Sequence, residues 1–344
     1  MTSDQPPQDS PEAVIAEFDR LIRRDPARRG LISSEPLSGP LCPGDLWSAA
    51  RELSQNGRRV GILTGFFIPH GSPPAAETDG PPGAVLLALA LQAAGMEAFV
   101  ISDEHCIGAV LAAAEAAGLS RSSVRCCPPG DPAARKQLLT GDGTEPVSHL
   151  ISIERVGPAH SEDSLSARPD CRPETLRQFL SLVPAESHGR CFNMRGVSID
   201  EYSADLHLLF DELPLCCPEA RTIGIGDGGN EIGMGRIAWE VLSARIPGPA
   251  AAVIPCRIAT DWTIIAGTSN WGGFALAAAV LYLKQLQSVA AGWDADFHLR
   301  LLEAMVWQGP AVDGVTGQQE SSVDGLPFLT WIQPWEAMYR MLGH

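Results

Sequence analysis

The sequence predicts an α/β protein with a Rossmann-like, doubly wound and mostly parallel sheet, helices on both faces and one irregular insertion. Short apolar runs rich in β-branched residues alternate with helical patterns, as a parallel sheet requires. Several of these runs end in polar, glycine-rich loops, which is typical of a ligand-binding sheet edge. We expect a tail and leading helix over residues 1–30, and one such domain over 31–344.

Composition and charge narrow the class of protein. The 344 residues are 45% hydrophobic, which is enough for a substantial core. The formal net charge of −16 argues against a nucleic-acid partner, because binding phosphates needs a basic face. The nine cysteines are scattered without a C-x-x-C pair, which favours free thiols in a reducing compartment.

Targeting and membrane signals are also informative. The longest apolar runs, 84–91 and 274–283, are far below the roughly 20 residues that span a bilayer, so we expect no membrane association. Residues 1–11 are polar and acidic, unlike a signal peptide. The sequence therefore predicts a cytoplasmic protein, and it leaves a homo-oligomer open.

The first part of the chain supplies two amphipathic helices and the first strand. The helices are predicted at 13–24 and 45–54, and a buried strand follows at 59–63. The connection over 64–82 is much longer than a usual βα loop, which favours a functional role. It leads into a helix over 84–94 that is apolar nearly all round and is therefore expected to be buried.

The alternation of strands and helices then continues. Further strands are predicted at 97–101, 123–126, 149–153 and 262–266, and further helices at 106–117 and 273–287. Residues 155–200 are polar and irregular, so we interpret them as the insertion.

Residues 221–235, RTIGIGDGGNEIGMG, are predicted to form a strand, a tight turn and a helix. The helical pattern begins near Asn230, which is a plausible N-cap. Gly233 and Gly235 would each cost a helix interior about 1 kcal/mol relative to alanine. Their presence suggests that something approaches the backbone closely.

This stretch admits more than one interpretation. Gly224, Gly226 and Gly229 have the G-x-G-x-x-G spacing of a dinucleotide site, but Asp227 and Glu231 would repel a bare pyrophosphate. A divalent cation would reverse that objection, because carboxylate and amide oxygens are its preferred ligands. The remaining alternative is that these polar residues simply cap a helix.

Polar side chains follow four of the predicted strands. If those strands share one parallel sheet, their loops converge at its carboxyl edge. The carboxylates expected to crowd one cleft are Glu77, Asp79, Glu154, Asp227, Glu231 and Asp261. A bound metal or protonation would relieve their mutual repulsion.

Three other chemistries lack their motifs. Trp271 stands where the second glycine of a G-x-S-x-G nucleophile turn belongs. The eight histidines include no H-x-x-x-H pair, which argues against a zinc hydrolase. No G-x-x-x-x-G-K-[ST] string is present, so a P-loop is excluded.

Seven strings form an ordered set along the chain: ETDGPPGA (77–84), ERVG (154–157), NMRG (193–196), GDGGNEIGMG (226–235), ATDWTIIAGTSNWGG (259–273), DGVTG (313–317) and VDGL (323–326). This set, over roughly 45–328, resembles the C-terminal domain family of D-glutamate cyclase. The additional N-terminal domain and mitochondrial targeting segment of the vertebrate enzyme are not seen in this sequence.

The resemblance implies a lyase of D-amino acid metabolism that converts D-glutamate, or a related acid, to 5-oxo-D-proline with loss of water. It also implies a divalent metal, with manganese as first choice and magnesium or calcium as alternatives. The candidate metal ligands are Glu154, Asp227, Asn230, Glu231 and Asp261. A metal there would neutralise the side-chain carboxylate of the substrate, which the substrate's own amine must attack.

The other expected roles follow from the same chemistry. Glu77 or Asp79 would transfer the protons, and Arg155 or Arg195 would grip the α-carboxylate. The residues expected to contact the substrate are Thr64, Gly65, Asn193, Gly228, Gly229, Ser269 and Asn270.

Two alternatives from other classes stay open. One is a metal-dependent hydrolase of a phosphorylated or lactam substrate, because an acidic metal cleft serves that chemistry equally well. The other is a non-catalytic nucleotide- or metabolite-binding protein built on the G-x-G-x-x-G spacing. Replacing Asp227 by asparagine separates them, because a metal enzyme would lose metal affinity and turnover together.

Overall fold

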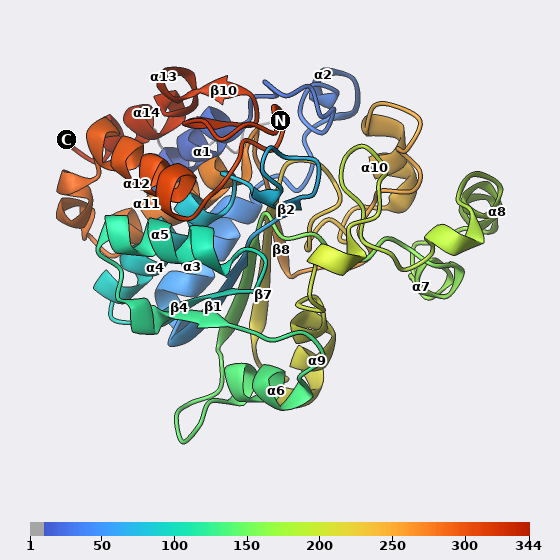
Figure 1. Ribbon diagram of the computed structural model, residues 1–344, viewed down its shortest axis with the longest axis horizontal. Helices are drawn as coiled ribbons and strands as arrows, with labels where there is room; N and C mark the ends of the chain where they lie inside the picture. The colour runs from blue at the N-terminus through green and yellow to red at the C-terminus, as the bar shows by residue number, and fades with distance from the viewer. Residues whose placement is uncertain (1–9) are drawn as a thin grey trace.

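The central feature of the structure is a six-stranded parallel sheet (Figure 1). The computed structural model describes residues 10–344; the first nine residues of the predicted acidic tail lie outside this range. The strands are β1 (Arg59–Thr64), β4 (Glu97–Ser102), β5 (Val124–Cys126), β6 (His149–Ile153), β7 (Arg221–Gly226) and β8 (Trp262–Ile265). The predicted α/β class is confirmed.

The strand order fixes where a ligand can bind. It runs β5-β4-β1-β6-β7-β8, so by order in the chain the strands lie 3-2-1-4-5-6, as in Rossmann-like doubly wound sheets. The order reverses between β1 and β6. A crevice is expected at the carboxyl ends of the strands beside this point.

Both faces of the sheet are buried in apolar cores. Val60 and Ile62 of β1 belong to one core and Leu63 to the other, because successive side chains of a strand alternate between faces. Ile62 pairs in register with Val100 of β4 and Ile151 of β6, so the alternation continues across the sheet.

Helices cover the two faces (Figure 1). The first core includes residues of α1 (Pro11–Ile22), α3 (Asp45–Asn56), α4 (Pro81–Ala93), α5 (Ile107–Ala117), α11 (Ser269–Leu283), α12 (Ala295–Gln308), α13 (Phe328–Trp331) and α14 (Gln333–Met341). The second includes residues of α6 (Pro132–Thr140), α9 (Leu208–Cys216) and α10 (Trp239–Arg245).

The smaller elements lie in the connections. A hairpin of β2 (Phe67–Ile68) and β3 (Ala75–Ala76) occupies the long loop after β1, and β9 (Ser322–Val323) pairs with β10 (Leu326–Pro327). The short α2 (Glu35–Ser38) follows α1. The predicted insertion contains α7 (Glu162–Ser166) and α8 (Pro173–Leu182), which stand away from the body of the molecule in Figure 1.

Two largely buried apolar helices, α4 and α11, pack closely against each other. An added Cβ on Gly273 would lie only 2.8 Å from the Cα of Gly83, so these glycines allow the close approach. The predicted burial of α4 is confirmed. Within residues 10–344, no helix is both long and apolar enough to cross a membrane.

The predicted helix near Asn230 is wrong. The next helix, α10, begins only at Trp239, because backbone groups directly after β7 bond to neighbouring segments and make only isolated turns among themselves. The N–H of Ile232 donates to the carbonyl of Arg155 at 2.9 Å, and the N–H of Gly233 donates to that of Ile258 at 2.9 Å.

The expected close approach to this stretch is confirmed, and what approaches is the chain itself. An added Cβ on Gly224 would lie 2.5 Å from the Cα of Gly233, and one on Gly235 would meet the carbonyl of Arg257. Asn230 caps no helix; its side-chain amide donates to the carbonyl of Phe192 at 2.8 Å.

Candidate metal and substrate site

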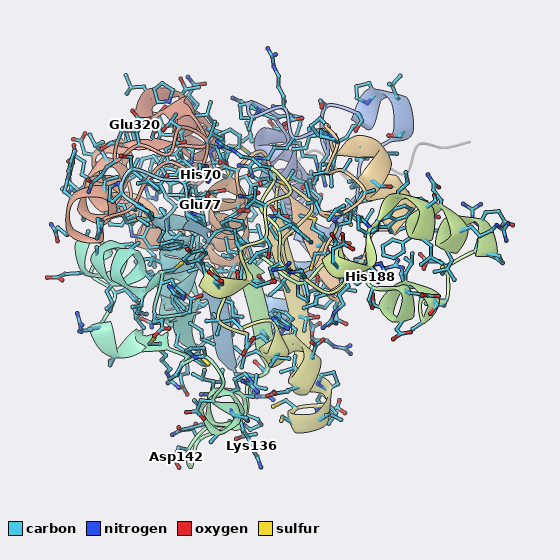
Figure 2. The ribbon with its side chains drawn as sticks, turned by 45° about the vertical axis from the view of Figure 1, so that its right-hand side comes forward. His70, Glu77, Lys136, Asp142, His188 and Glu320 are labelled. Carbon is cyan, nitrogen blue, oxygen red and sulfur yellow. The ribbon has the colours of Figure 1, made fainter. Side chains whose placement is uncertain are left out.

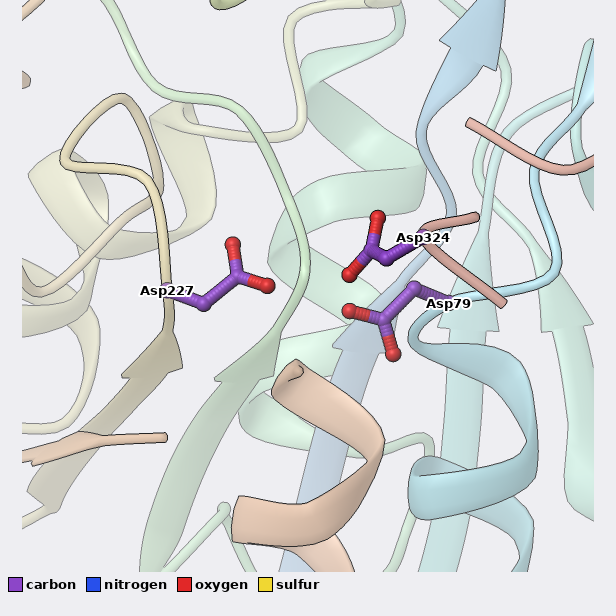
Figure 3. Close-up of side chains that lie close together, drawn as sticks. All are labelled: Asp79, Asp227 and Asp324. Carbon is purple, nitrogen blue, oxygen red and sulfur yellow. The ribbon is translucent and has the colours of Figure 1, made fainter. Parts of the chain in front are cut away.

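Buried carboxylates gather at the carboxyl edge of the sheet, beside the point where the strand order reverses. Thr64 ends β1, Glu154 follows β6 and Asp227 follows β7, while Asp79 precedes α4. Six of the carboxylates that are at most 4% exposed form the cluster: Glu77, Asp79, Glu154, Asp227, Glu231 and Asp324. Asp79, Asp227 and Asp324 point toward one another in Figure 3.

Two groups of these carboxylates have the spacing of a cation site. One oxygen each of Asp79, Asp227 and Asp324 lie within 4.8 Å of one another. The same holds for Glu154, Asp227 and Glu231. Asp227 belongs to both groups, and oxygen ligands of this kind suit a hard divalent cation.

Three carboxylate oxygens in the cluster are buried without a hydrogen-bond partner in the part of the chain that the structure describes: Oε1 of Glu77, Oδ2 of Asp227 and Oδ2 of Asp324. A buried anionic oxygen is costly unless it is paired or bound to a metal. These unpaired oxygens therefore fit a bound cation.

Burial and mutual repulsion shift the acidity of the cluster. Burial, and then the neighbouring Glu154, raises the pKa of Glu77 well above its usual range. Burial likewise raises the pKa of Glu154 and of Asp227, while Arg29 opposes the rise. A cation among these groups would reverse the shift.

Glu231 organises the glycine-rich turn. Its carboxylate accepts the backbone N–H of Asp227 at 3.0 Å, of Gly228 at 2.7 Å and of Gly229 at 2.7 Å. These donors would have to bind a phosphate in a dinucleotide site, and no helix begins at the turn. The backbone N–H groups of Gly228 and Gly229 are therefore already used within the protein, and their contact with a substrate stays a prediction.

Asp79 and Asn270 cap each other's helices. Asp79 accepts the N–H of Ser269 at 2.7 Å and of Asn270 at 2.8 Å, at the start of α11. The side-chain oxygen of Asn270 accepts the N–H of Gly80 at 3.1 Å and of Gly83 at 2.8 Å, at the start of α4. Burial raises the pKa of Asp79 to about 8, whereas its backbone donors lower it. These bonds fix the positions of Asp79 and Asn270 at the edge of the site.

Glu154 is held in an uncommon backbone conformation. Its φ is +46°, in the left-handed region that residues other than glycine rarely adopt and that is often found at functional sites. The hydroxyl of Ser269 donates to its carboxylate at 2.5 Å. Ser269 is therefore placed to orient Glu154.

Arg155 is not placed to grip a substrate. Its guanidinium is 1% exposed, forms an ion pair with Asp103 at 2.5 Å, and donates to the carbonyl of Gly65 at 2.8 Å. It also donates to the carbonyl of Ser203. Arg155 and Gly65 thus fasten the loop after β1 to the sheet.

The prediction that Asp261 is a metal ligand is wrong. Asp261 precedes β8, so it lies at the amino end of the sheet, opposite the carboxylate cluster. Its side chain accepts the backbone N–H of Thr222 at 2.8 Å and the hydroxyl of Thr222 at 2.9 Å, at the start of β7.

A cavity of about 230 Å³ opens beside the cluster. Its lining includes Glu77, Glu154 and Asn230, and also His70 and Arg195. Figure 2 shows His70 and Glu77 in the upper part of the molecule, and Lys136 and Asp142 at the opposite end. A cavity of this size suits a small polar substrate.

Arg195 reaches the cavity from a turn that Asn193 closes. The side-chain oxygen of Asn193 accepts the N–H of Arg195 and of Val197, each at 3.0 Å. Arg195 itself is exposed, and within residues 10–344 its side chain makes only a long bond of 3.4 Å to the carbonyl of Val315. Its guanidinium is thus available to a carboxylate ligand.

Two residues of the cluster are missing from the predicted site. Arg29 forms ion pairs with Asp227 and Asp324 and lines the cavity. Asp324 lies in VDGL, one of the seven strings that carry the family resemblance, so the sequence did contain a signal for this residue. Arg29 lies far from the clustered carboxylates in sequence, within the segment predicted to be a tail and leading helix. No local sequence pattern indicates its role.

Comparison with known proteins identifies relatives. A model of the family described as D-glutamate cyclase-like, C-terminal, matches residues 18–170 and 183–337. D-glutamate cyclase, mitochondrial, of Homo sapiens is 30% identical over 91% of this chain and 49% of its own length. The chain therefore spans about half the length of this curated relative. The gap between the matched ranges contains α8, whereas Arg29 and all the clustered carboxylates lie inside them.

Proposed function

The chain belongs to the D-glutamate cyclase-like family, and from this premise we propose that it converts D-glutamate to 5-oxo-D-proline with loss of water. The name of the human relative, D-glutamate cyclase, supports the substrate and the ring closure. The observation that carries the proposal is the buried carboxylate cluster with unpaired oxygens, open to a cavity that also presents Arg195.

The cavity has groups that match both ends of glutamate. Arg195 is our choice for the α-carboxylate, because it lines the cavity and its donors are nearly free. The side-chain carboxylate of the substrate would then face the cluster around Asp227. Glutamate carries a carboxylate at each end, whereas a simple amino acid has only the α-carboxylate. Separate binding groups for two carboxylates therefore favour glutamate.

A divalent metal is the cofactor that we propose, with manganese first and magnesium or calcium as alternatives. When bound, it would neutralise the substrate's side-chain carboxylate and polarise its carbonyl. Asp227 would hold it together with Asp79 and Asp324, or with Glu154 and Glu231. Asn230 lines the cavity and could add its amide oxygen, because its amide nitrogen is committed to Phe192.

Glu77 is our candidate for proton transfer. It lines the cavity, its Oε1 has no partner among the described residues, and burial raises its pKa, which favours a carboxyl group that can carry a proton. The substrate nitrogen loses two protons and bonds to the side-chain carboxyl carbon. One carbon–oxygen bond breaks, and that oxygen leaves with the two protons as water.

The structure weakens one of the two competing functions and leaves the other compatible with the carboxylate cluster. The dinucleotide or metabolite sensor loses its main support, because Glu231 occupies the backbone donors of the G-x-G-x-x-G turn. A metal-dependent hydrolase would use the same cluster and becomes the conclusion if D-glutamate is not a substrate. The cytoplasmic location, the homo-oligomer and the single domain over 31–344 stay predictions; the human relative's name says mitochondrial.

The direct test is product formation from D-glutamate and, as a control, L-glutamate, followed by proton NMR in the presence of manganese. The expected result is 5-oxo-D-proline from the D-isomer and far slower turnover of the L-isomer. Binding of manganese without any product from D-glutamate would contradict the proposed reaction.

A further inference from the structure

Arg29 is delivered to the carboxylate cluster by a fixed turn between α1 and α2. The carboxylate of Asp25 accepts the backbone N–H of Arg29 at 2.7 Å and of Gly30 at 2.9 Å. Gly30 has a φ of +91°, and an added Cβ there would strike the carbonyl of Arg245. Arg245 in turn donates to the carbonyl of Leu31 at 2.8 Å. The backbone position of Arg29 is thus fixed, because hydrogen bonds hold Arg29 itself and the residues that follow it.

The guanidinium of Arg29 joins two carboxylates by one oxygen each. It pairs with Oδ1 of Asp227 and Oδ1 of Asp324, and the second oxygen of each carboxylate has no partner among residues 10–344. The Arg29 side chain is 13% exposed and lines the cavity beside Glu77 and Glu154. It therefore touches both the cluster and the space that a substrate would occupy.

Asp227 and Asp324 are also two of the three carboxylates in one candidate cation group. A guanidinium and a divalent cation in contact with the same carboxylates repel each other and compete for them. When the carboxylates bind the cation, the forked donors of Arg29 need a new acceptor. A substrate carboxylate in the adjoining cavity is the acceptor within reach of a planar guanidinium.

We propose that Arg29 is a substrate-binding residue that exchanges partners: it is held by Asp227 and Asp324, and it turns to a substrate carboxylate when these two residues bind a divalent cation. The inference rests on the proposed function for its substrate, but its first half concerns metal binding alone. Metal and substrate then favour each other's binding through Arg29, because the coupling between two sites is reciprocal.

The test titrates the chelator-treated full chain with Mn²⁺ and measures free Mn²⁺ by electron paramagnetic resonance. Arg29→Gln should bind Mn²⁺ about tenfold more tightly than the wild type, because its competitor is gone. Arg28→Gln is the matched control. Arg28 lines the same cavity and carries the same charge, but it pairs with no carboxylate in the described part of the chain.

The titration is then repeated with saturating D-glutamate. The wild type should gain Mn²⁺ affinity, and Arg29→Gln should gain clearly less, because only the part of the coupling that runs through Arg29 is lost. If Arg29→Gln melts too low to be titrated, the rise of its melting temperature with Mn²⁺ replaces the first measurement. That rise should be larger than in Arg29→Lys, which keeps the charge.

Equal or weaker Mn²⁺ affinity in folded Arg29→Gln, or an equal gain in Arg28→Gln, would overturn the competition. An undiminished response of Arg29→Gln to D-glutamate would overturn the exchange of partners. Failure of the proposed function is recognised separately, because it shows as wild-type protein that binds Mn²⁺ but neither responds to D-glutamate nor turns it over.

Discussion

At the scale of one residue, the carboxylate of Glu231 stabilises the glycine-rich turn to which it belongs. Its two oxygens accept the N–H groups of Asp227, Gly228 and Gly229. Glu231→Gln keeps the shape but turns an amide donor toward one of those N–H groups. We expect a loss of about 1–3 kcal/mol in the free energy of unfolding, measured with urea. The exposed Glu219→Gln is the control, and an equal effect of both would contradict the assigned role.

The two arginines predicted to bind substrate should separate cleanly. Arg195 lines the cavity, so Arg195→Gln should raise KM for D-glutamate about tenfold or more with an unchanged melting temperature. Arg155 is buried against Asp103, so Arg155→Lys should lower the melting temperature and leave KM unchanged. The reverse pattern, from kinetics and thermal unfolding, would restore Arg155 as the substrate ligand.

At the scale of elements, the site depends on the paired starts of α4 and α11. Asn270→Ala removes the acceptor of the Gly80 and Gly83 N–H groups, so we expect a loss of about 1–2 kcal/mol in unfolding free energy together with weaker metal binding. Asp294→Ala removes the cap of α12, which accepts the Phe297 N–H at 2.8 Å, and it should cost stability alone. Equal metal affinity in the two variants would contradict the link between cap and site.

The sequence predicted the strands well, because a buried strand is recognisable as a short apolar run from its local sequence alone. It also predicted most of the cluster, since carboxyl ends of parallel strands converge. Asp261 failed because it precedes its strand, and a position before a strand lies at the opposite edge. The helix near Asn230 failed because tertiary backbone bonds to Arg155 and Ile258 outcompeted the local pattern.

What the sequence could not show is contact between distant segments. Arg29 and Asp324 reach the cluster from near the two ends of the chain, and only the fold brings them to Asp227. Neither periodicity nor spacing carries that information.

At the scale of the whole molecule, buried histidines should make stability depend on pH. His298 is fully buried in an aromatic cluster, neither ring nitrogen has a hydrogen-bond partner among the described residues, and burial lowers its pKa to about 3. The unfolded chain binds this proton below pH 6.5 but the folded protein does not, so stability is lost as the pH falls toward 3.

His298→Phe removes this penalty. The stability of the variant relative to the wild type should improve by about 2 kcal/mol between pH 8 and pH 5, measured by urea unfolding at both values. The same difference between the two proteins at both pH values would show that His298 is not buried in its neutral form.

The most direct test of the central claim, a metal-dependent cyclase centred on Asp227, measures Mn²⁺ binding and D-glutamate turnover together in the wild type and Asp227→Asn. The protein is first treated with chelator, and manganese is then restored. We expect the wild type to lose and regain turnover, and Asp227→Asn to lose Mn²⁺ affinity and turnover together. Full turnover after chelation, or an Asp227→Asn variant that keeps both properties, would contradict the claim.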